Sequence, residues 1–409
     1  MMTTCRFCST PLSLSLVNLG MTPLANSNLR SRDDISTEKA FPLHVMVCEK
    51  CYLAQTTETV PADAIFHDDY AYFSSFSSSW VEHARQYCEI MRHRFDLDES
   101  SLVIEVASND GYLLQHFAKA GIPVLGVEPA GNCAAEAELR GVPSMVAFFG
   151  SALGERLVSE GRQADLMAAN NVLAHVPDIS DFVKGFSIAL KPEGVVTFEF
   201  PHLLNLINLV QFDTIYHEHY SYLSLIAVET ILRSHRLRVF DVQQLPTHGG
   251  SLRVFACREE ASHAEQPGLF AVRAAEKHAR LDERAGYEGF TAKVEKVRED
   301  FLAFLGEAKR AGKTIAGYGA AAKGNTFLNY CGLGADDIAY VADRNVHKQG
   351  RFLPGVHAPI VDPEKIMETK PDYVVILPWN LAREVEQQLA PVRDWGGRFV
   401  TAIPELKIF

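Results

Sequence analysis

The chain has 409 residues, of which 47% are hydrophobic and 22% are charged. This composition is typical of a folded globular protein and excludes a chain that is disordered throughout. Its 51 acidic and 39 basic residues give a formal net charge of −12. That charge argues against sequence-independent binding of DNA or RNA, which depends on neutralising phosphates. At roughly 150 residues per domain, the length predicts two or three domains.

Neither a targeting segment nor a membrane span is recognisable in the sequence. The first residues, MMTTCR, lack the apolar stretch of a secretory signal, and no run approaches the roughly 20 apolar residues of a spanning helix. Four of the eight cysteines, Cys88, Cys133, Cys257 and Cys331, are scattered singly, which suits reduced thiols better than a disulfide framework. We therefore expect a soluble, cytoplasmic protein that binds neither a nucleic acid polymer nor a membrane.

Two pairs of cysteines mark the first predicted domain, residues 1–68. Cys5 and Cys8 form one C-x-x-C pair, and Cys48 and Cys51 form the second. Two such pairs can place four thiolates around one tetrahedral Zn²⁺, which would then be structural because it has no open position. The alternatives are four ordinary buried cysteines, or redox-active pairs, although neither pair begins a recognisable helix.

The second part, residues 69–258, alternates strand and helix patterns and is predicted to be a doubly wound α/β domain. The predicted strands lie at residues 102–106, 124–128, 145–147, 165–169 and 195–200. A hairpin is expected to follow, with strands at 237–242 and 251–256 joined across the THGG loop. A parallel sheet closed by such a hairpin is typical of a Class I methyltransferase.

The carboxyl end of the first predicted strand is the expected ligand site of this sheet. Glu105 ends the strand, and the loop after it contains Ala107, Asn109 and Gly111. Glu128 ends the second strand and could accept hydrogen bonds from two ribose hydroxyls. Because Ala107 and Asn109 stand where a dinucleotide fingerprint has glycine, the loop favours S-adenosylmethionine, which has no pyrophosphate, over NAD. An α/β core that binds neither molecule is the alternative.

The densest chemistry lies after the fifth strand, in the sequence YHEHYSY at 216–222. These side chains would make a poor core segment, because each buried polar tip needs a partner, but they are suitable acids, bases and donors around a reacting substrate. A surface loop is one alternative. A metal site is another, although H-E-H lacks the H-E-x-x-H spacing that places two imidazoles on one helix face.

Three residues outside that segment are also candidates for the same site. Asn170 and His175 follow the fourth predicted strand, so we expect them to face the same crevice, although a lone histidine there is as often structural. Tyr70 lies just before the first helix of the domain, where a lid over the methyl donor could form.

The third part, residues 259–409, is predicted to be a second, smaller α/β domain. It opens with a charged helical stretch to Lys313, which we interpret as a solvated linker helix. A strand, a glycine loop and a helix follow in TIAGYGAAAKGNT at 314–326, and further strands are predicted at 338–342, 373–377 and 398–401.

The glycine loop of this part predicts a phosphate site, because backbone N–H groups at a helix N-terminus suit an anion and a lysine adds positive charge. The residues expected to bind there are Gly319, Ala321, Lys323, Asn325, Arg344 and Lys348. A Rossmann-like fold that has lost its ligand is the alternative.

Six motifs of the chain together resemble one family. They are the paired N-terminal cysteines, EVASNDG at 105–111, NNVLAHV at 170–176, YHEHYSY at 216–222, HGGSLR at 248–253 and GYGAAAKGNT at 317–326. In this order they look like the S-adenosylmethionine-dependent C-methyltransferases that act on nucleotide-linked deoxysugars. The resemblance covers nearly the whole chain. It implies a small zinc-binding domain, a Class I methyltransferase domain and a C-terminal Rossmann-like domain that helps hold the nucleotide sugar.

The resemblance also implies a substrate and roles for individual residues. The substrate would be a dTDP-linked 4-keto-deoxysugar methylated at C-3, and the enzyme a monomer or weak homo-oligomer. His219 would remove the proton next to the ketone, with Glu218 or a tyrosine to orient it, although the choice of base among the histidines and tyrosines stays open. Catalytic roles are implied for His219, Tyr216, Glu218, His175 and Tyr70, and substrate contacts are expected from Tyr216, Tyr222 and His248.

Two other classes of protein remain open. An NAD(P)-dependent nucleotide-sugar oxidoreductase would use a glycine loop for its dinucleotide, but neither loop carries a complete G-x-G-x-x-G. A non-catalytic nucleotide-sugar-binding protein would explain zinc and two α/β domains, but it leaves YHEHYSY without a task.

Overall fold

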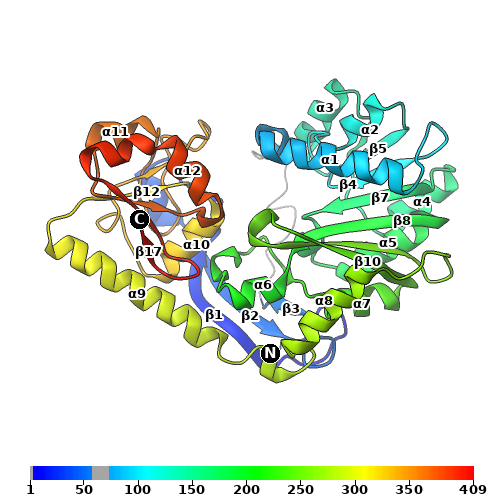
Figure 1. Cartoon of the computed structure of the whole chain (residues 1–409), viewed down its shortest axis with the longest axis horizontal. Helices are drawn as coiled ribbons and strands as arrows, with labels where there is room; N and C mark the ends of the chain where they lie inside the picture. Colours follow the sequence, from blue (N-terminus) through cyan, green and yellow to red (C-terminus); the bar gives the residue numbers. More distant parts are fainter. Residues whose placement is uncertain (1–2, 58–72) are drawn as a thin grey trace.

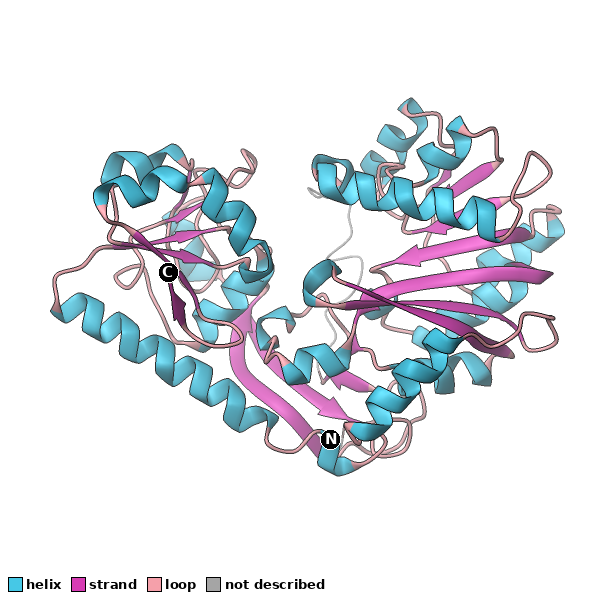
Figure 2. Cartoon of the chain, viewed as in Figure 1, coloured by secondary structure: helices cyan, strands magenta, loops and turns pink. Residues whose placement is uncertain are grey.

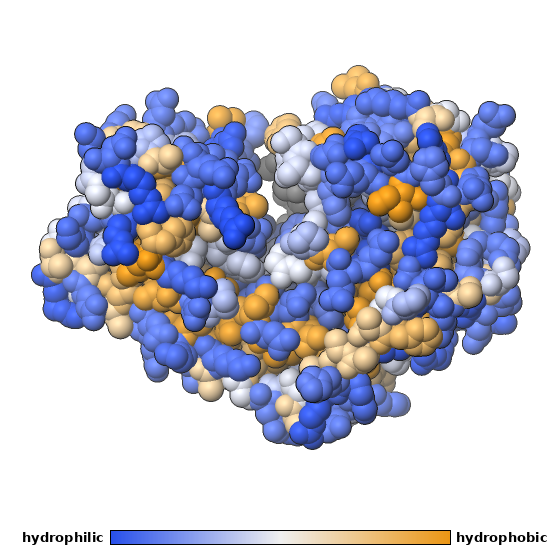
Figure 3. Space-filling model, viewed as in Figure 1, coloured by the Kyte–Doolittle hydropathy of each residue, from blue (hydrophilic) through white to orange (hydrophobic). Residues whose placement is uncertain are grey.

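The computed structural model of the chain describes residues 3–57 and 73–409 (Figure 1). Its strands form sheets of four, seven and six strands. Figure 1 shows the two larger sheets in separate lobes, with β1 and β2 running below and between them. Figure 2 shows helices around both of these sheets, and Figure 3 shows that the surface is hollowed between the two lobes. Among the described residues, no helix is long and apolar enough to cross a membrane.

The four-stranded sheet is antiparallel and takes one strand from the middle of the chain. Its strands, in the order β1-β2-β3-β9, are β1 (Leu14–Pro23), β2 (Ala40–Val47), β3 (Ala54–Thr56) and β9 (Ser221–Tyr222). In β9, Ser221 pairs with Gln55 and Tyr222 pairs with Ala54. The YHEHYSY segment is therefore built into the N-terminal sheet.

The seven-stranded sheet has the strand order of a Class I methyltransferase, β10-β11-β8-β7-β4-β5-β6, with β11 antiparallel to both of its neighbours. Its strands are β4 (Val103–Val106), β5 (Val124–Val127), β6 (Ser144–Met145), β7 (Ala164–Asn170), β8 (Leu190–Pro201), β10 (Leu237–Leu245) and β11 (Ser251–Arg258). The predicted hairpin is confirmed by the pairing of β10 with β11.

Helices cover both faces of this sheet. On β4, Val103 packs in an apolar cluster with Tyr87 and Phe117, whereas its neighbour Ile104 packs in another cluster with Phe182. Successive strand residues point to opposite faces, so both faces are buried and a continuous apolar run results. The helices are α1 (Ser78–Arg94), α2 (Leu114–Lys119), α3 (Gly131–Leu139), α4 (Ser151–Ser159), α5 (Ile179–Ala189), α6 (Leu203–Asn208), α7 (Leu225–Ser234) and α8 (Pro267–His278).

The six-stranded sheet has the order β14-β13-β12-β15-β16-β17 and is parallel except for β17. Its strands are β12 (Ile315–Tyr318), β13 (Val341–Ala342), β14 (Ile360–Val361), β15 (Tyr373–Ile376), β16 (Arg398–Thr401) and β17 (Lys407–Ile408). Its helices are α9 (Phe290–Arg310), α10 (Ala322–Tyr330), α11 (Glu364–Thr369) and α12 (Ala382–Gln388). The strand predicted at 338–342 is thus confined to its last two residues.

Short 3-10 helices connect these elements. They are η1 (Arg32–Thr37), η3 (Ser74–Phe76), η4 (Leu173–His175), η5 (Phe212–Thr214), η6 (Thr247–Gly249), η7 (Arg284–Gly286), η8 (Trp379–Leu381) and η9 (Ala390–Trp395).

The interpretation of residues 259–313 as a solvated linker helix is wrong. The segment contains two helices, of which α8 packs against β10 and α7, while α9 packs against β1. In α9, Phe290, Val294, Val297 and Phe301 are buried, at the spacing that places side chains on one helix face. Most charged residues of the segment lie on the outer faces, with Glu276 a buried exception, and they obscured this apolar stripe.

Candidate active site and metal centre

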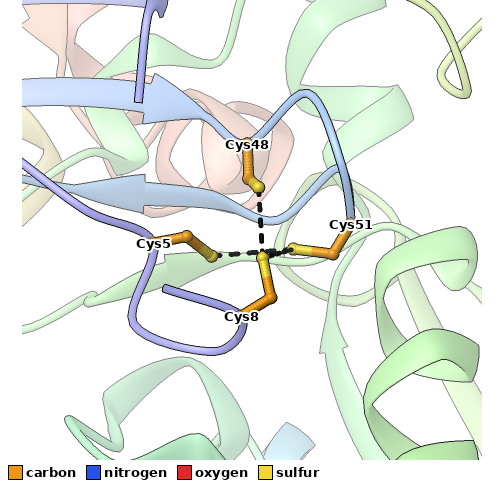
Figure 4. Close-up of side chains that lie close together, drawn as sticks. All are labelled: Cys5, Cys8, Cys48 and Cys51. Carbon is orange, nitrogen blue, oxygen red and sulfur yellow. Dashed lines mark hydrogen bonds between the residues drawn. The ribbon is translucent and has the colours of Figure 1, made fainter. Parts of the chain in front are cut away.

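The four paired cysteines converge on one point (Figure 4). The sulfur of Cys8 lies 3.5 Å from that of Cys48 and 3.6 Å from that of Cys51, which lies 3.6 Å from Cys5. A tetrahedral zinc with Zn–S bonds of about 2.3 Å places its sulfurs about 3.8 Å apart, whereas a disulfide needs about 2 Å. The cluster therefore fits a structural zinc ion. Hydrogen bonding from Cys51 lowers the pKa of Cys5, which favours the thiolate form that a metal binds.

The loop after β4, with the ends of β5 and β7, is the first candidate ligand site and is called the first crevice below. Ala107 and Asn109 have left-handed backbones, with φ of 57° and 50°. Glu128, at the end of β5, accepts hydrogen bonds from the backbone N–H of Asn109 and of Ala130, both at 2.9 Å. A Cβ atom added at Gly111 would lie 3.1 Å from Ala137 Cβ, so glycine is required there by packing against α3.

Several buried polar atoms of this crevice have no hydrogen-bond partner among the described residues. They are Glu105 Oε2, Ser108 Oγ, Asn170 Oδ1 and Asn171 Oδ1. Burial raises the pKa of Glu105 well above its usual range and also raises that of Glu128. Unpaired buried polar atoms are costly, and they suit a ligand with amino, carboxylate and hydroxyl groups, such as S-adenosylmethionine. The cofactor residues predicted from the sequence, Glu105, Ala107, Asn109, Gly111, Glu128 and Asn170, are thus gathered at one end of β4, β5 and β7.

His219 and His175 lie together beside this crevice, with ring centroids 4.6 Å apart. His219 Nδ1 lies 2.8 Å from the Thr214 carbonyl oxygen, and His175 Nδ1 lies 2.8 Å from that of Glu218. A carbonyl only accepts, so each Nδ1 carries the proton and Nε2 of His219 keeps its lone pair. Burial lowers the pKa of His175 to about 4, and burial together with His175 lowers that of His219 well below its usual range. His219 is therefore a neutral imidazole at neutral pH, and the lone pair of its Nε2 is not used by the Thr214 contact.

The expectation that YHEHYSY avoids the core is wrong for four of its members. His217, Tyr220, Ser221 and Tyr222 are buried. Tyr220 N–H donates to the Ala174 carbonyl at 2.8 Å, and the guanidinium carbon of Arg6 lies 5.5 Å from the Tyr220 ring. Nε2 of His217 lies 3.2 Å from the Pro42 carbonyl oxygen, so these partners stand on distant segments that the local sequence does not reveal.

The tyrosines and Glu218 divide around His219. The Tyr216 ring lies 4.0 Å from the His219 ring between centroids, and the Tyr222 ring lies 6.1 Å from it. Glu218 turns its carboxylate elsewhere, since its Oε1 accepts a hydrogen bond from Asn26 Nδ2 at 2.6 Å. The group that orients His219 is the Thr214 carbonyl, in place of the Glu218 carboxylate or a tyrosine. Tyr70 lies outside the described residues.

The C-terminal domain brings Lys323 and Trp379 to the same region. Lys323 Nζ donates to Asn380 Oδ1 at 2.8 Å and lies 4.8 Å from the Trp379 ring centroid. Trp379 Nε1–H donates to Asp213 Oδ2 at 2.8 Å. Asp213 directly precedes Thr214, whose carbonyl contacts Nδ1 of His219. Burial raises the pKa of Asp213 to about 6, while Lys323 opposes that change.

The second glycine loop is largely occupied by its own chain. Ala320 N–H donates to Asp343 Oδ2 at 2.7 Å, and Lys348 Nζ donates to the Ala320 carbonyl at 2.8 Å. Pro378 packs against Gly319, whose φ is 89°, so that an added Cβ would lie 2.7 Å from Pro378 Cγ. Of the other predicted phosphate ligands, Arg344 is exposed, Ala321 precedes α10, and Asn325 is buried with Oδ1 unpartnered among the described residues.

His248 belongs to a polar group that the sequence did not predict. It has a left-handed backbone with φ of 55°, and its ring lies 5.3 Å from the Trp80 ring. The adjacent Thr247 donates to the buried Glu199 at 3.1 Å, which also accepts from Arg253 at 2.8 Å. Of these residues, His248 was a predicted substrate contact and Arg253 shares its HGGSLR motif, whereas Trp80, Asp213, Trp379 and Asn26 had no signal.

Partial likeness to solved methyltransferases accompanies this geometry. Magnesium protoporphyrin IX methyltransferase from Synechocystis PCC 6803, solved with bound SAM, is 16% identical and covers 44% of this chain and 81% of its own, with a TM-score of 0.33. The 1,6-didemethyltoxoflavin-N1-methyltransferase from Burkholderia thailandensis is 16% identical and covers 50% of this chain and 95% of its own, with a TM-score of 0.36.

Family comparisons cover nearly the whole chain. Residues 5–66 match a zinc binding domain, residues 80–240 match a methyltransferase domain, and residues 246–404 match a C-methyltransferase C-terminal domain. The C-methyltransferase NovU of Streptomyces niveus is 38% identical over 404 residues, which span 99% of this chain and 96% of NovU. The chain therefore belongs to this family of C-methyltransferases, with a zinc-binding N-terminal domain and an S-adenosylmethionine-dependent methyltransferase domain.

Proposed function

We propose that the chain transfers a methyl group from S-adenosylmethionine to C-3 of a dTDP-linked 4-keto-deoxysugar by way of an enolate. The observation that carries this proposal is His219, a partly buried, neutral imidazole with its proton held on Nδ1 by the Thr214 carbonyl. A carbon next to a ketone loses its proton to a positioned base, and Nε2 of His219 provides one. The resemblance of YHEHYSY and its surrounding motifs to sugar C-methyltransferases supports the choice of substrate.

The developing oxyanion of the enolate needs a hydrogen-bond donor. Tyr216 is suited to that role, because its ring lies against that of the base at 4.0 Å between centroids. A neutral His175 uses its Nδ1 proton on the Glu218 carbonyl, so we assign it to contacts with the sugar, as we do Tyr222 and His248. Tyr70 lies outside the described residues, and we keep it, with Tyr216, as a candidate for stabilising the enolate and the sugar.

The crevice after β4 would hold S-adenosylmethionine, which supplies an electrophilic methyl group. Glu128 is placed to accept hydrogen bonds from ribose hydroxyls, as an acid after the second strand does in nucleoside-binding sheets. The unpartnered oxygens of Glu105 and Asn170 supply further polar contacts. These residues, with the loop from Ala107 to Gly111, keep the methyl donor beside the base.

The C-terminal loop would hold the sugar nucleotide by its charged side chains. Since the backbone of Ala320 is already bonded by Asp343 and Lys348, the pyrophosphate contacts fall mainly to Lys323 and Arg344. We expect Lys323→Ala to raise the KM for the sugar nucleotide about 10-fold and to leave binding of S-adenosylhomocysteine unchanged. Lys309→Ala is the matched control, because that lysine pairs with Asp337 on the surface. An unchanged KM in Lys323→Ala would contradict this assignment.

The oxidoreductase alternative is disfavoured by the same loop. A dinucleotide would need the space over Gly319 that Pro378 fills.

The decisive experiment follows the proton as well as the methyl group. In D₂O, with S-adenosylhomocysteine bound, the wild-type enzyme should exchange the C-3 hydrogen of the keto-sugar for deuterium, as read by mass spectrometry. His219→Asn should lose both this exchange and methyl transfer by at least about 1,000-fold while it still binds S-adenosylhomocysteine. His93→Asn, an exposed histidine on α1, is the control. Near-normal exchange in His219→Asn would rule out His219 as the base.

A further inference from the structure

Arg6 lies between two cysteines of the metal cluster, yet its side chain contacts the segment that carries the catalytic histidine. Its Nη1 donates to the Tyr220 carbonyl at 2.5 Å, and its Nη2 donates to Thr56 Oγ1 at 3.0 Å and to the Thr56 carbonyl. The guanidinium carbon also lies 5.5 Å from the centroid of the Tyr220 ring. A planar guanidinium has five N–H donors in a fixed fork, so it can hold several oxygens in one geometry.

Gln55 ties Arg6 to both the metal cluster and the sheet. Its Oε1 accepts the backbone N–H of Arg6 at 2.9 Å, and its Nε2 donates to Cys5 Sγ at 3.2 Å. Its backbone pairs with Ser221 where β3 meets β9. A hydrogen bond to a metal-ligating sulfur both orients that sulfur and stabilises its charge. The cysteine cluster, Arg6 and β9 therefore form one connected hydrogen-bonded unit.

The main chain of Tyr220 is hydrogen-bonded through both its carbonyl and its N–H. Its carbonyl accepts from Arg6 and also from Thr56 N–H at 3.1 Å, while its own N–H donates to the Ala174 carbonyl at 2.8 Å. Tyr220 directly follows His219, and Ala174 directly precedes His175. Each imidazole is therefore one residue away from a backbone bond that Arg6 helps to fix.

We propose that Arg6 is a positioning residue, through which the zinc-binding cluster holds His219 and His175 in their working geometry. The N-terminal domain then contributes to methyl transfer as well as to folding. This inference rests on the proposed role of His219, since the effect on turnover is expected through that residue.

The test is Arg6→Lys, which keeps the positive charge but lacks the planar fork that spans the Tyr220 carbonyl and the two Thr56 oxygens. We expect kcat to fall about 10- to 100-fold while the KM for the sugar nucleotide changes less than about 3-fold. Zinc content, measured by elemental analysis, and affinity for S-adenosylhomocysteine should match the wild type. Amide hydrogen exchange in residues 216–222 should become faster, because the Tyr220 carbonyl loses its charged donor.

Arg284→Lys is the matched control. Arg284 forms an exposed ion pair, at 3.1 Å, with Glu49, which lies between Cys48 and Cys51 in the sequence. It should leave kcat and exchange in 216–222 unchanged. Thr56→Val removes the hydroxyl that accepts from Arg6 at 3.0 Å and leaves the four cysteines and Arg6 itself unchanged. It should lower kcat about 3- to 10-fold. This variant tests the inference if Arg6→Lys does not fold.

An unchanged kcat in Arg6→Lys, a change in KM alone, or a loss of activity that follows a loss of zinc would each overturn the inference. Hydrogen exchange distinguishes a failure of the positioning role of Arg6 from a failure of the proposed function. If the wild-type enzyme methylated no keto-sugar, faster exchange at 216–222 in Arg6→Lys would still support positioning, and unchanged exchange would exclude it.

Discussion

The crevice after β4 and the crevice after β12 are built in the same way, each with a left-handed loop residue and an acid after the neighbouring strand. Glu128 accepts the N–H of Asn109 at 2.9 Å, and Asp343 accepts the N–H of Ala320 at 2.7 Å. The two crevices differ at the strand on the other side. There β7 ends in Asn170, with an unpartnered buried oxygen, whereas β15 is followed by Pro378, which packs on Gly319.

One flanking strand therefore decides what each crevice can do. The polar end of β7 leaves a buried oxygen, on Asn170, that a ligand can satisfy, so the first crevice suits a cofactor. An apolar end fills the space, so in our proposal the second crevice binds no cofactor and only its charged side chains contact the substrate. Four changes would break or sharpen this contrast.

Gly319→Ala should have the largest effect, on stability. The added Cβ would meet the Pro378 ring, and φ of 89° is unfavourable for alanine, so we expect the free energy of unfolding to fall by about 3 kcal/mol. Gly312→Ala, where nothing lies within 4 Å of the added Cβ, should cost only about 1 kcal/mol. Denaturant unfolding measures both. Equal losses would mean that Pro378 does not fill the second crevice.

Asn170→Phe should make the first crevice resemble the second. An apolar ring in place of the unpartnered amide would fill the space at the end of β7, and we expect affinity for S-adenosylhomocysteine to fall about 100-fold, or about 2.7 kcal/mol. Trp379→Phe, an apolar change at the second crevice, should leave that affinity unchanged. Calorimetric titration compares the two; wild-type affinity in Asn170→Phe would place the cofactor elsewhere.

The matched pair Glu128→Gln and Asp343→Asn tests whether the two acids do different work. Loss of a charged acceptor for ribose should weaken S-adenosylhomocysteine binding about 10- to 30-fold in Glu128→Gln, since hydrogen bonds to charged groups contribute about 1.5–3 kcal/mol. Asp343→Asn should leave this affinity within about 2-fold, because its carboxylate bonds only to the N–H groups of Ala320 and Asn345. Similar losses in both variants would contradict the contrast.

Proton balance should give the smallest effect. His175, beside the first crevice, has its pKa lowered to about 4 by burial, whereas an unfolded chain binds that proton near pH 6.5. The unfolded state thus binds more protons between these values, and stability should fall as the pH drops from 7 to 5, by about 1–2 kcal/mol from this residue. His175→Gln should reduce this pH dependence in denaturant unfolding. An identical pH dependence would show that folding does not lower the pKa of His175.

Both parallel sheets could be predicted because each core strand is a local apolar run. β4, β5 and β7 lie where the sequence places them, within one or two residues. By contrast, β14 and β17 have two residues each, too few for a pattern. β9 exists only because a distant strand, β3, pairs with it. Tertiary pairing therefore set the parts of the fold that the local pattern did not.

The site divides along the same line. The cysteine pairs could be predicted because metal-ligand spacing is local, and the six motifs led to the histidines. Asp213, Trp379 and Arg6 could not, since each is a common residue whose role arises from a partner far along the chain: Trp379 for Asp213 and Tyr220 for Arg6. The burial of Tyr220 was missed for the same reason.

The place of β9 in the N-terminal sheet has a consequence for how the protein is made. During synthesis, β1, β2 and β3 emerge first, but the sheet is complete only when residues 221–222 have left the ribosome. Until then the edge of β3 presents unpaired backbone groups, which is a hazard for association between chains. A fragment ending at residue 68 should therefore associate through the edge of β3. In the full chain β9, which is translated later, covers this edge.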